Sequence, residues 1–548
     1  MRVHLHGALL LSIAVAVAAA CSAADDGGNN AGGAGGSGGA AGSDASLGGG
    51  AGSAGDAGTD GIQPATTVVV VGPGADATSK DKFGGPDDPY AKPEIVYPAP
   101  GIVTPPNMQT LELHWKPGAG QTLFEIRFES AAIALVVYTG CNPVGGGCVY
   151  QTDKQFWAQL VDPNRGGPPV GYRIRGVNGS SPYGVGVSET RTLAFSKENI
   201  IGGLYYWNTS GVIQRYDFGL PGAPAEQFMT PVMAGALTCV GCHALSRDGK
   251  RMAVGNDIPA PAPYKVYDVA TRLPLSGEAG VVGGAANFFA FSPKGDRLLY
   301  SDGVKTGLQD VETGALLNPN FLPAGTMPDW SPNGELVVYA KGKPPPFGFG
   351  NPGCFDAGLE VIKLSGGSWS QPTVLVPFAG QNNFYPSFAP AQNWVVFNRS
   401  PSNMDSYSAG PPTGDGELWA VPTAGGNPIR LEAANNGGSC SWAKWAPDVG
   451  TYYGGTLMWL TFSSARAYGL RLPKGSKVQL WMSAFNPQNG SQGKDPSLPA
   501  FWLPFQDVAG GNHIAQWVTS VERQPCTDKG QCQAGEECVN GKCVPVVK

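Results

Sequence analysis

A turn motif that recurs through the second half of the chain constrains the fold more than any other feature. Each copy follows an aromatic or apolar residue, and most copies lead into an apolar run. Copies lie roughly 40–60 residues apart, the period of a β-propeller blade whose polar turn joins its innermost strand to the next. We therefore predict a β-propeller. The five copies are Ser246-Arg247-Asp248-Gly249, Ser292-Pro293-Lys294-Gly295, Ser331-Pro332-Asn333-Gly334, Ala389-Pro390-Ala391 and Ala446-Pro447-Asp448.

A sixth blade can be assembled from the two ends of this region. Apolar segments 501–503 and 513–517 would supply its late-chain strands, and segments 204–207 and 212–216 would close the ring. We predict six blades, with five or seven as alternatives. The repeat resembles that of the TolB-like propellers, which reads Ser-Pro-Asp-Gly-Lys, and this resemblance implies a TolB-like propeller over residues 197–525.

The segment ahead of the propeller, residues 92–196, alternates apolar and polar residues in short runs broken by turns, as a β-sandwich does. Its landmarks are the strand pattern ending at Trp115 and the Tyr172–Asn178 segment. These resemble the Trp and Tyr strands of a fibronectin type III domain, a family of spacers and binding modules. The fold class predicted for the whole chain is thus all-β.

The N-terminal segment has the features of an export signal. Arg2 precedes an apolar run from Ala8 to Ala20, which is short for a membrane span, so residues 1–20 are predicted to be a signal peptide. The sequence Ala18-Ala19-Ala20-Cys21 resembles a bacterial lipobox, which implies lipidation of Cys21, with ordinary cleavage as the alternative. Residues 21–91 are rich in Gly, Ala and Ser and are predicted to form a disordered tether. The predicted location is the outer membrane, on its periplasmic or cell-surface side.

The charge composition bears on the partners. The net charge is −6 and no basic block occurs, so nucleic acid is excluded as a partner. Membrane contact is expected through the N-terminal lipid only. The redox or envelope partner and the oligomeric state are left open.

The cysteines outside the propeller's first blade are interpreted as structural. Cys141 and Cys148 bracket a turn-rich loop that a disulfide could close in an oxidising compartment. Cys354 and Cys440 are left over within the propeller and are predicted, by elimination, to pair across neighbouring blades. The tail, residues 526–548, is too small for a core and should be held by two disulfides in one of three connectivities. Its cysteines are Cys526, Cys532, Cys538 and Cys543.

One motif carries chemistry. Cys239-Val240-Gly241-Cys242-His243 has the two thiols and adjacent imidazole that a covalent c-type haem requires, with His243 as the iron ligand. TolB-like proteins with this motif directly ahead of a blade turn also occur. A structural disulfide, a redox-active dithiol and a metal site remain as alternatives.

The second axial ligand of such a haem has several candidates. His513 is the better histidine, because ring closure would place its blade beside the first, although a hydrogen-bonded strand-end histidine is the competing interpretation. Met229, Met233 and Met252 are near the motif in sequence, and an open position is the remaining alternative.

Two functions remain in contention. The first is a cell-envelope lipoprotein that carries one haem c and acts in electron transfer or redox sensing. The second is a haem-free scaffold that binds a protein or polymer. Hydrolysis is disfavoured, because no Gly-x-Ser-x-Gly motif occurs and Asp302, Asp329 and Asp448 fit turn positions better than a metal cluster. Enzymatic activity is left open, with a non-enzymatic role favoured.

Overall fold

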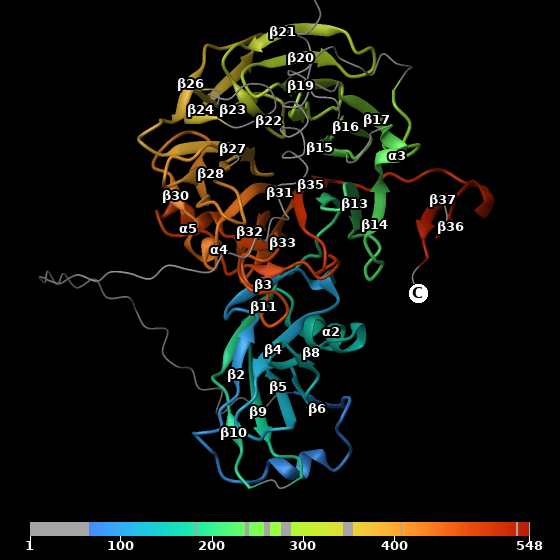
Figure 1. Ribbon diagram of the computed structural model, residues 1–548, viewed down its shortest axis with the longest axis vertical. Helices are drawn as coiled ribbons and strands as arrows, with labels where there is room; N and C mark the ends of the chain where they lie inside the picture. The colour runs from blue at the N-terminus through green and yellow to red at the C-terminus, as the bar shows by residue number, and fades with distance from the viewer. Residues whose placement is uncertain are drawn as a thin grey trace, which may run out of the picture.

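The structure is a computed structural model that describes residues 65–180, 183–235, 240–256, 264–275, 286–343, 354–406, 408–532 and 535–546. The predicted signal peptide, Cys21 and Cys239 lie outside the described residues. The described chain forms a β-sandwich, a β-propeller and a small tail (Figure 1), which confirms the all-β prediction.

The sandwich is built from two sheets. The larger has the strand order β1-β6-β5-β9-β11-β3, with β10 paired to β9, and the smaller has the order β2-β4-β8-β7. Trp115 is fully buried between the sheets and lies edge-on to Phe124, with ring centroids 5.1 Å apart. The predicted sandwich is confirmed, and its assignment to the fibronectin type III family stays a prediction. The elements are β1 (Thr67–Val71), β2 (Glu94–Tyr97), β3 (Ile102–Thr104), β4 (Glu112–Lys116), β5 (Leu123–Glu129), β6 (Ala134–Gly140), β7 (Pro143–Val144), β8 (Gly147–Gln151), β9 (Val170–Val177), β10 (Gly186–Val187) and β11 (Arg191–Phe195), with the helix α2 (Lys154–Val161) and the short 3-10 turns η2 (Pro106–Met108) and η3 (Asp162–Asn164).

The end of the predicted tether, residues 65–91, is ordered, so the tether prediction is wrong for these residues. Strand β1 pairs in parallel with β6 along its whole length. The 3-10 turn η1 (Ser79–Phe83) buries Phe83 against an apolar cluster of the sandwich that includes Val136. Val68 and Val70 pack against the core and Phe83 is buried, whereas the Gly-rich part of the tether has no large apolar side chains to bury.

The propeller has six sheets arranged as blades within the described residues, which confirms the count of six. Blade 1 consists of β35 (Asn512–Val518), β12 (Gly203–Asn208), β13 (Val212–Asp217) and β14 (Glu226–Met229); blade 2 of β15 (Val240–Leu245), β16 (Arg251–Asn256) and β17 (Lys265–Asp268); blade 3 of β18 (Phe288–Phe291), β19 (Arg297–Ser301), β20 (Thr306–Asp310) and β21 (Leu316–Leu322). Blade 4 consists of β22 (Thr326–Trp330), β23 (Leu336–Lys343), β24 (Phe355–Ser365) and β26 (Thr373–Val376), with β25 (Ser368–Trp369) at its edge; blade 5 of β27 (Asn382–Phe388), β28 (Trp394–Ser400), β29 (Glu417–Pro422) and β30 (Ile429–Arg430); blade 6 of β31 (Cys440–Tyr452), β32 (Gly455–Ser464), β33 (Gln479–Phe485) and β34 (Phe501–Trp502).

Ring closure uses the late-chain strand β35, which pairs antiparallel with β12. The inner strands β15, β18, β22, β27, β31 and β35 contact one another in that order around the axis, and β35 returns to β15 (Figure 1). Segment 501–503 was predicted to join this closing blade, and that part is wrong. Phe501–Trp502 forms β34 and pairs with β33, because blade 6 needs an outer strand to cover its edge.

The sandwich packs against the rim of blades 1 and 6, and one apolar core runs through both domains. In Figure 1 the sandwich lies below the ring. The Trp502 backbone N–H donates to Tyr97 Oη at 3.0 Å, and the Glu198 carboxylate accepts from Thr451 N–H at 2.7 Å. The two domains therefore share a buried apolar interface, and the Glu198–Thr451 contact beside it is exposed.

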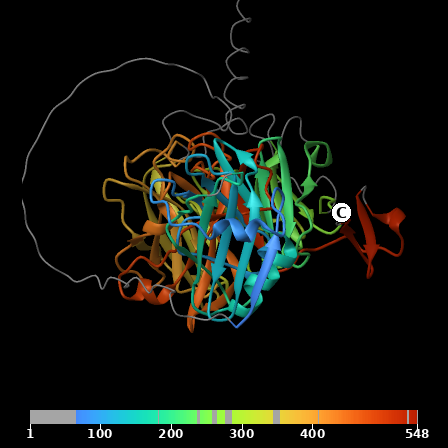
Figure 2. The same cartoon turned by 90° about the horizontal axis from the view of Figure 1, so that it is seen from below.

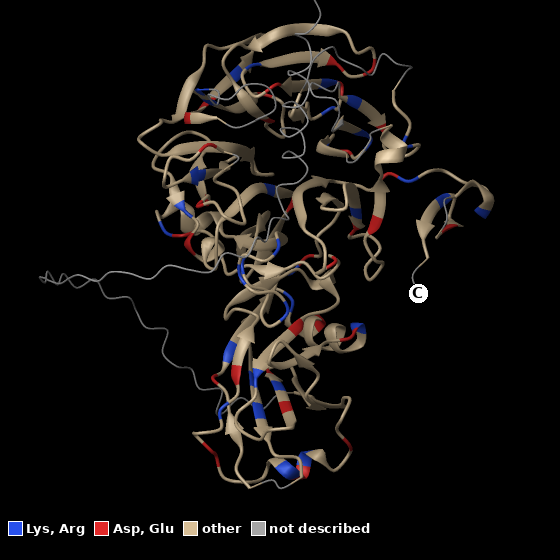
Figure 3. Cartoon of the chain, in the orientation of Figure 1, with Lys and Arg blue, Asp and Glu red and all other residues tan. Residues whose placement is uncertain are grey.

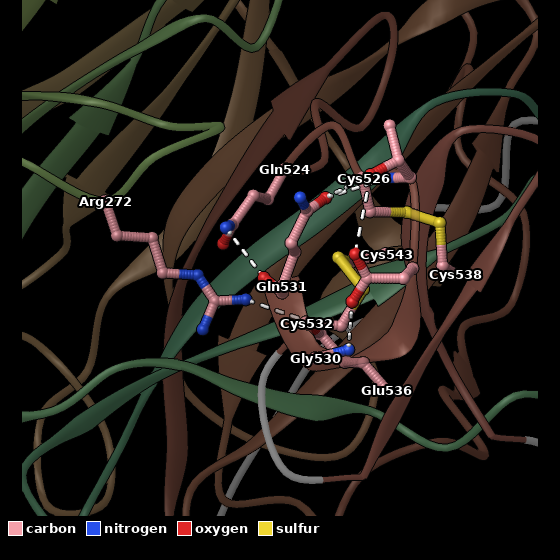
Figure 4. The surroundings of a disulfide bond; sticks show 11 residues. Arg272, Gln524, Cys526, Gly530, Gln531, Cys532, Glu536, Cys538 and Cys543 are labelled. Atoms are coloured by element: carbon pink, nitrogen blue, oxygen red, sulfur yellow. Dashed lines mark hydrogen bonds and ion pairs between the residues drawn. A yellow bond between two sulfur atoms is a disulfide. The ribbon is translucent and has the colours of Figure 1, made fainter.

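The tail is held by disulfides Cys526–Cys538 and Cys532–Cys543, which selects one of the three connectivities that the sequence left open. It contains the short turn η5 (Lys529–Gln531) and a hairpin of β36 (Glu536–Val539) and β37 (Lys542–Pro545). Figure 2 shows it standing beside the main body. In Figure 4 Arg272, beyond the end of β17, reaches Glu536 of the tail at 3.3 Å, and each side chain is only 8% exposed.

Charged residues of both signs are scattered along the described chain (Figure 3). No helix in the described ranges has the length and apolar character needed to cross a bilayer.

Candidate haem-attachment site and propeller channel

Cys242 and His243 lie on β15, the inner strand of blade 2. Cys242 occupies a β-bulge, where the pairing with β16 shifts register between Gly241 and Ala244, and its φ is 45°. Four other inner strands also contain a bulge residue with a positive φ. In each strand this residue stands four positions before the first residue of the blade turn, or before the equivalent residue where the turn motif is absent. These residues are Met327, Tyr385, Trp442 and Ile514, and Phe288 holds the equivalent position in blade 3 without a bulge.

The bulge positions form a ring of side chains, three of them aromatic, around the propeller axis. Trp442 of blade 6 stacks on Tyr385 of blade 5 with centroids 3.9 Å apart. Trp442 also lies 6.1 Å from Phe288 of blade 3, which is the blade opposite blade 6. Because residues from opposite blades meet, these rings fill the channel at this level.

The Cys242 thiol is free and half-buried, and it packs against an apolar cluster of blades 2 and 3 that includes Ala286 and Phe289. Burial raises the pKa of Cys242 to about 11. The sulfur is therefore protonated at neutral pH. A redox-active dithiol relies on a lowered thiol pKa, so this environment is opposite to the one that such chemistry needs.

The His243 imidazole is 3% exposed, and neither ring nitrogen has a hydrogen-bond partner within the described residues. Burial lowers the pKa of His243 to about 4, against a smaller opposite effect of the Tyr205 backbone in β12. The ring is therefore neutral at pH 7. A buried polar atom without a partner costs free energy, and such groups in native proteins call for an explanation.

The described donors fit a haem iron in their chemistry. A neutral imidazole with unused nitrogens is the usual axial ligand, and a protonated free thiol can form a thioether. In this structure the two side chains lean toward different neighbours: Cys242 packs toward blade 3, whereas His243 lies beside the Tyr205 backbone of blade 1.

His513 lies on β35, which is adjacent to β15 in the ring as predicted. Its Nδ1 lies 2.6 Å from Ser463 Oγ of blade 6, and its ring is edge-on to Trp442 at 6.0 Å. Burial lowers the pKa of His513 to about 4. The described residues show no contact between the His513 and His243 rings, so the structure does not bring them together as a ligand pair.

The methionine candidates have other surroundings. Met229 and Met252 are fully buried in an apolar cluster of blades 1 and 2, as packing residues are. Met233 lies in the short helix α3 (Pro231–Ala234) and is 38% exposed.

Sequence reasoning missed a second, polar level of the channel. It lies two positions beyond the bulge ring, on the same face of each inner strand, and its members are Ala244, Ala290, Asp329, Ser387, Lys444 and Gln516. They border a cavity of about 80 Å³ that is also lined by Arg247 from a blade turn. The sequence did offer a signal for this level: a charged residue stands two positions before the turn motif in strands that are otherwise apolar.

Asp329 was expected in a turn, but it lies within β22 and faces this cavity. Its Oδ2 accepts from Phe388 N–H at 2.7 Å, and its Oδ1 lies 3.7 Å from Lys444 Nζ. Asp448 lies within β31 and accepts from Ile201 N–H, whereas Asp302 does stabilise a turn by accepting from Lys305 N–H.

No family model matches the chain, and no curated protein matches it. Among solved structures, the chain is similar to the dihydro-heme d1 dehydrogenase NirN in complex with DHE, at 11% identity and a TM-score of 0.31, covering 55% of this chain and 54% of that one. It is similar to prolyl endopeptidases at 13% identity and a TM-score of 0.30, covering 53% of this chain and 47% of that one. A eukaryotic initiation factor matches at 13% identity and a TM-score of 0.28, covering 78% of this chain and 94% of that one. The chain spans about half the length of the first two.

The remaining cysteines divide into paired and free. Cys141 and Cys148 form the expected disulfide, with Cα atoms 5.1 Å apart. The predicted Cys354–Cys440 disulfide is wrong, because both thiols are free and buried. Cys354 precedes β24 of blade 4 and Cys440 begins β31 of blade 6, so blade 5 separates them.

Proposed function

We propose that this chain is an exported cell-envelope lipoprotein whose propeller carries one haem c. Cys239 and Cys242 would hold the haem through thioethers, and His243 would be its axial ligand. The observation that supports this most is the His243 ring, which is buried, neutral and without a hydrogen-bond partner in the described residues. An iron ligand would satisfy one of the nitrogens that the protein leaves unpaired.

A bound haem would supply reversible one-electron chemistry. The chain's own contribution is a rigid frame, because the inner strands close into a ring and the aromatic residues at the bulge level fill its axis. The sequence has a single Cys-x-x-Cys-His motif, which suits a single-electron carrier or a redox sensor. No catalytic role is assigned.

Attachment of haem would require a local change at β15. Cys242 and His243 lean toward blades 3 and 1 in this structure, so the strand must turn at least one of them. The bulge at Cys242 is a place where this is feasible, because the pairing with β16 is already interrupted there.

His513 stays a prediction as the second axial ligand. Its Nδ1 is engaged with Ser463, whereas Nε2 has no hydrogen bond to another described residue. Replacement of His513 by Ala in haem-loaded protein tests the role. A shift of the Soret band would support ligation, and an unchanged band would assign His513 to the Ser463 hydrogen bond alone.

The anchor is proposed from Ala18-Ala19-Ala20-Cys21, and outer-membrane sorting follows the same resemblance. A Cys21→Ala variant tests it by fractionation of the expressing cells. We expect the wild-type chain in the outer-membrane fraction and the variant out of it. Equal membrane association of both would contradict lipidation.

The deciding experiment is a pyridine haemochrome spectrum of protein expressed with c-type haem maturation machinery. We expect a c-type α-band that is lost when Cys239 and Cys242 are both changed to Ala. A Cys354→Ala variant is the matched control, because its thiol is also free but belongs to blade 4, and it should retain the band. Colourless wild-type protein would reject the haem proposal.

The alternative function is a haem-free binding scaffold. It is favoured by the way all three parts are joined through buried contacts, such as Trp502 with Tyr97 and Arg272 with Glu536. Such joints hold the three parts in a fixed relative position, as a multidomain binding surface requires. If the protein is colourless but stable and monodisperse, the binding scaffold is the function that remains.

A further inference from the structure

We propose that the polar level of the propeller channel is a binding site for a small carboxylate. The carboxylate would lie between the Arg247 guanidinium and the Lys444 ammonium. This site differs from the Cys242–His243 pair, and the proposal does not depend on haem.

The charges lining the cavity do not balance. Arg247 and Lys444 are cations, and Asp329 is the one carboxylate among the described residues that line the same cavity. One of its oxygens already accepts from Phe388 N–H at 2.7 Å, and the other lies 3.7 Å from Lys444 Nζ. One positive charge is therefore left without a partner inside the channel, where an opposite charge interacts more strongly than in water.

The donors of Arg247 are largely unused. Its guanidinium carries five N–H groups, and its one hydrogen bond to another described residue is a long contact of 3.5 Å from Nη2 to the Trp330 carbonyl. Burial lowers the pKa of Arg247, against an opposite effect of Asp329, as expected for a charge that is short of partners. A planar guanidinium fork matches a carboxylate in geometry and charge.

The aromatic walls of the cavity offer a ligand no free indole N–H group, so binding would depend on Arg247 and Lys444. The indole N–H groups of the three lining tryptophans are already bonded: Trp330 to the Gly334 carbonyl, Trp445 to the Ser387 carbonyl and Trp517 to Thr461 Oγ1. They present apolar surfaces that are held in place. Ser387 and Gln516 have no side-chain hydrogen bond to other described residues and can add neutral donors.

The size of the cavity sets the class of ligand. Its volume is about 80 Å³, whereas pockets for drug-sized molecules and nucleotides span roughly 300–1,000 Å³. A monocarboxylate such as acetate, or the carboxylate tip of one acidic side chain, suits this space. Both candidate ligands present the same carboxylate group, which belongs to a small free acid in one case and to a protein side chain in the other.

The test is calorimetric titration of the full chain with sodium acetate at constant ionic strength set with chloride. We expect saturable binding that weakens at least about tenfold in Lys444→Gln and in Arg247→Gln. Asp329→Asn should tighten binding, because it removes the competing carboxylate while its amide oxygen can still accept from Phe388. Lys363→Gln, on the exposed outer part of blade 4, is the matched control and should bind as wild type does.

The acetate and peptide titrations distinguish a free acid from an acidic side chain, and they can also overturn the proposal. A capped peptide with one central Glu that binds more tightly than acetate would identify an acidic side chain as the ligand, and acetate alone would identify a free acid. Three results would overturn the site: no saturable acetate binding in wild type, equal binding in Lys444→Gln and Lys363→Gln, or binding of sulfate but not acetate. Thermal melts of each variant verify that the fold is intact.

Discussion

Glu112 of the sandwich and Arg471 of the propeller form a two-point ion pair, with Nε–Oε2 and Nη2–Oε1 distances that are both 2.7 Å. Tyr468 Oη also donates to Oε2 at 2.7 Å, and His114 Nε2 lies 2.9 Å from it. The Leu470 backbone N–H donates to His114 Nδ1, which places a proton on Nε2 and directs it at Glu112. One carboxylate thus gathers three donors across the domain interface.

Replacement of Glu112 by Gln should destabilise the chain by about 2 kcal/mol, because a carboxylate that is only 11% exposed loses its charge and the partly exposed Arg471 guanidinium loses its ion-pair partner. Chemical denaturation measures the effect. Glu94→Gln is the matched control: Glu94 pairs with Lys116 at 3.1 Å, but both side chains are more than half exposed, so a change below about 0.5 kcal/mol is expected. Equal effects of the two changes would contradict a structural role of the interface pair.

The contribution of Glu112 to the free energy of unfolding should fall as the pH is lowered. Burial alone raises the pKa of Glu112, but the hydrogen bonds from His114, Arg471 and Tyr468 outweigh it and lower the pKa from 4.5 to about 2. The stabilisation is therefore complete above about pH 4.5 and is lost as the pH falls toward 2. The unfolding free energy of wild type minus that of Glu112→Gln should be constant above pH 5 and shrink below it. A difference that stays constant down to pH 2.5 would refute this.

Arg272→Met should release the cysteine-rich tail from the propeller. The Arg272 guanidinium pairs with Glu536 at 3.3 Å and lies 5.0 Å from the Phe228 ring centroid, so it links the tail to blade 1. Hydrogen exchange should rise in β36 and β37 while both tail disulfides remain. Lys529→Met is the control, because the Lys529–Glu537 pair is exposed and 3.8 Å long. Unchanged exchange in the Arg272 variant would exclude this pair as the docking contact.

Cys354 and Cys440 should be unreactive in the folded protein and reactive in denaturant without reductant. Both are buried free thiols, and burial raises the pKa of Cys354 to about 12. Iodoacetamide labelling followed by peptide mass spectrometry measures each site. Cys141 and Cys148 provide the contrast, since they should label only after reduction. If Cys354 and Cys440 also required reduction, the two would be paired after all.

Loss of the Cys141–Cys148 bridge should cost about 2–3 kcal/mol by the loop-entropy estimate for a closed loop of this length. The bridge spans a sequence separation of 7 and ties β8 to the end of β6. A double Ser variant compared with wild type in urea gives the value. A change below about 0.5 kcal/mol would mean that the β7–β8 hairpin is held by its own pairing.

The repeat identified the propeller because its turns are local: each Ser-x-x-Gly turn is specified by residues that are adjacent in sequence. The partner of segment 501–502 could not be read in this way, because edge strands are short and pair wherever a blade lacks an outer strand. The Cys354–Cys440 prediction failed for a related reason. Counting the cysteines left over ignores which blade each residue occupies.

The functional residues also divide into those that the sequence revealed and those that it did not. Cys239, Cys242 and His243 were recognised because thioether chemistry fixes their spacing along the chain. Asp329, Lys444 and Arg247 were missed, since they come from three blades and meet only when the ring closes.

The sequence by itself determined the all-β class, the propeller repeat, the disulfide-rich tail and the Cys-x-x-Cys-His motif, because all of these follow from residue types at short separations. Only the tertiary structure decided that Cys242 is at a bulge, that His243 is buried without a partner and that two cations share one carboxylate in the channel. Those properties depend on which strands become neighbours, and closure of the ring sets that arrangement through contacts between residues as far apart as Leu204 and Trp517.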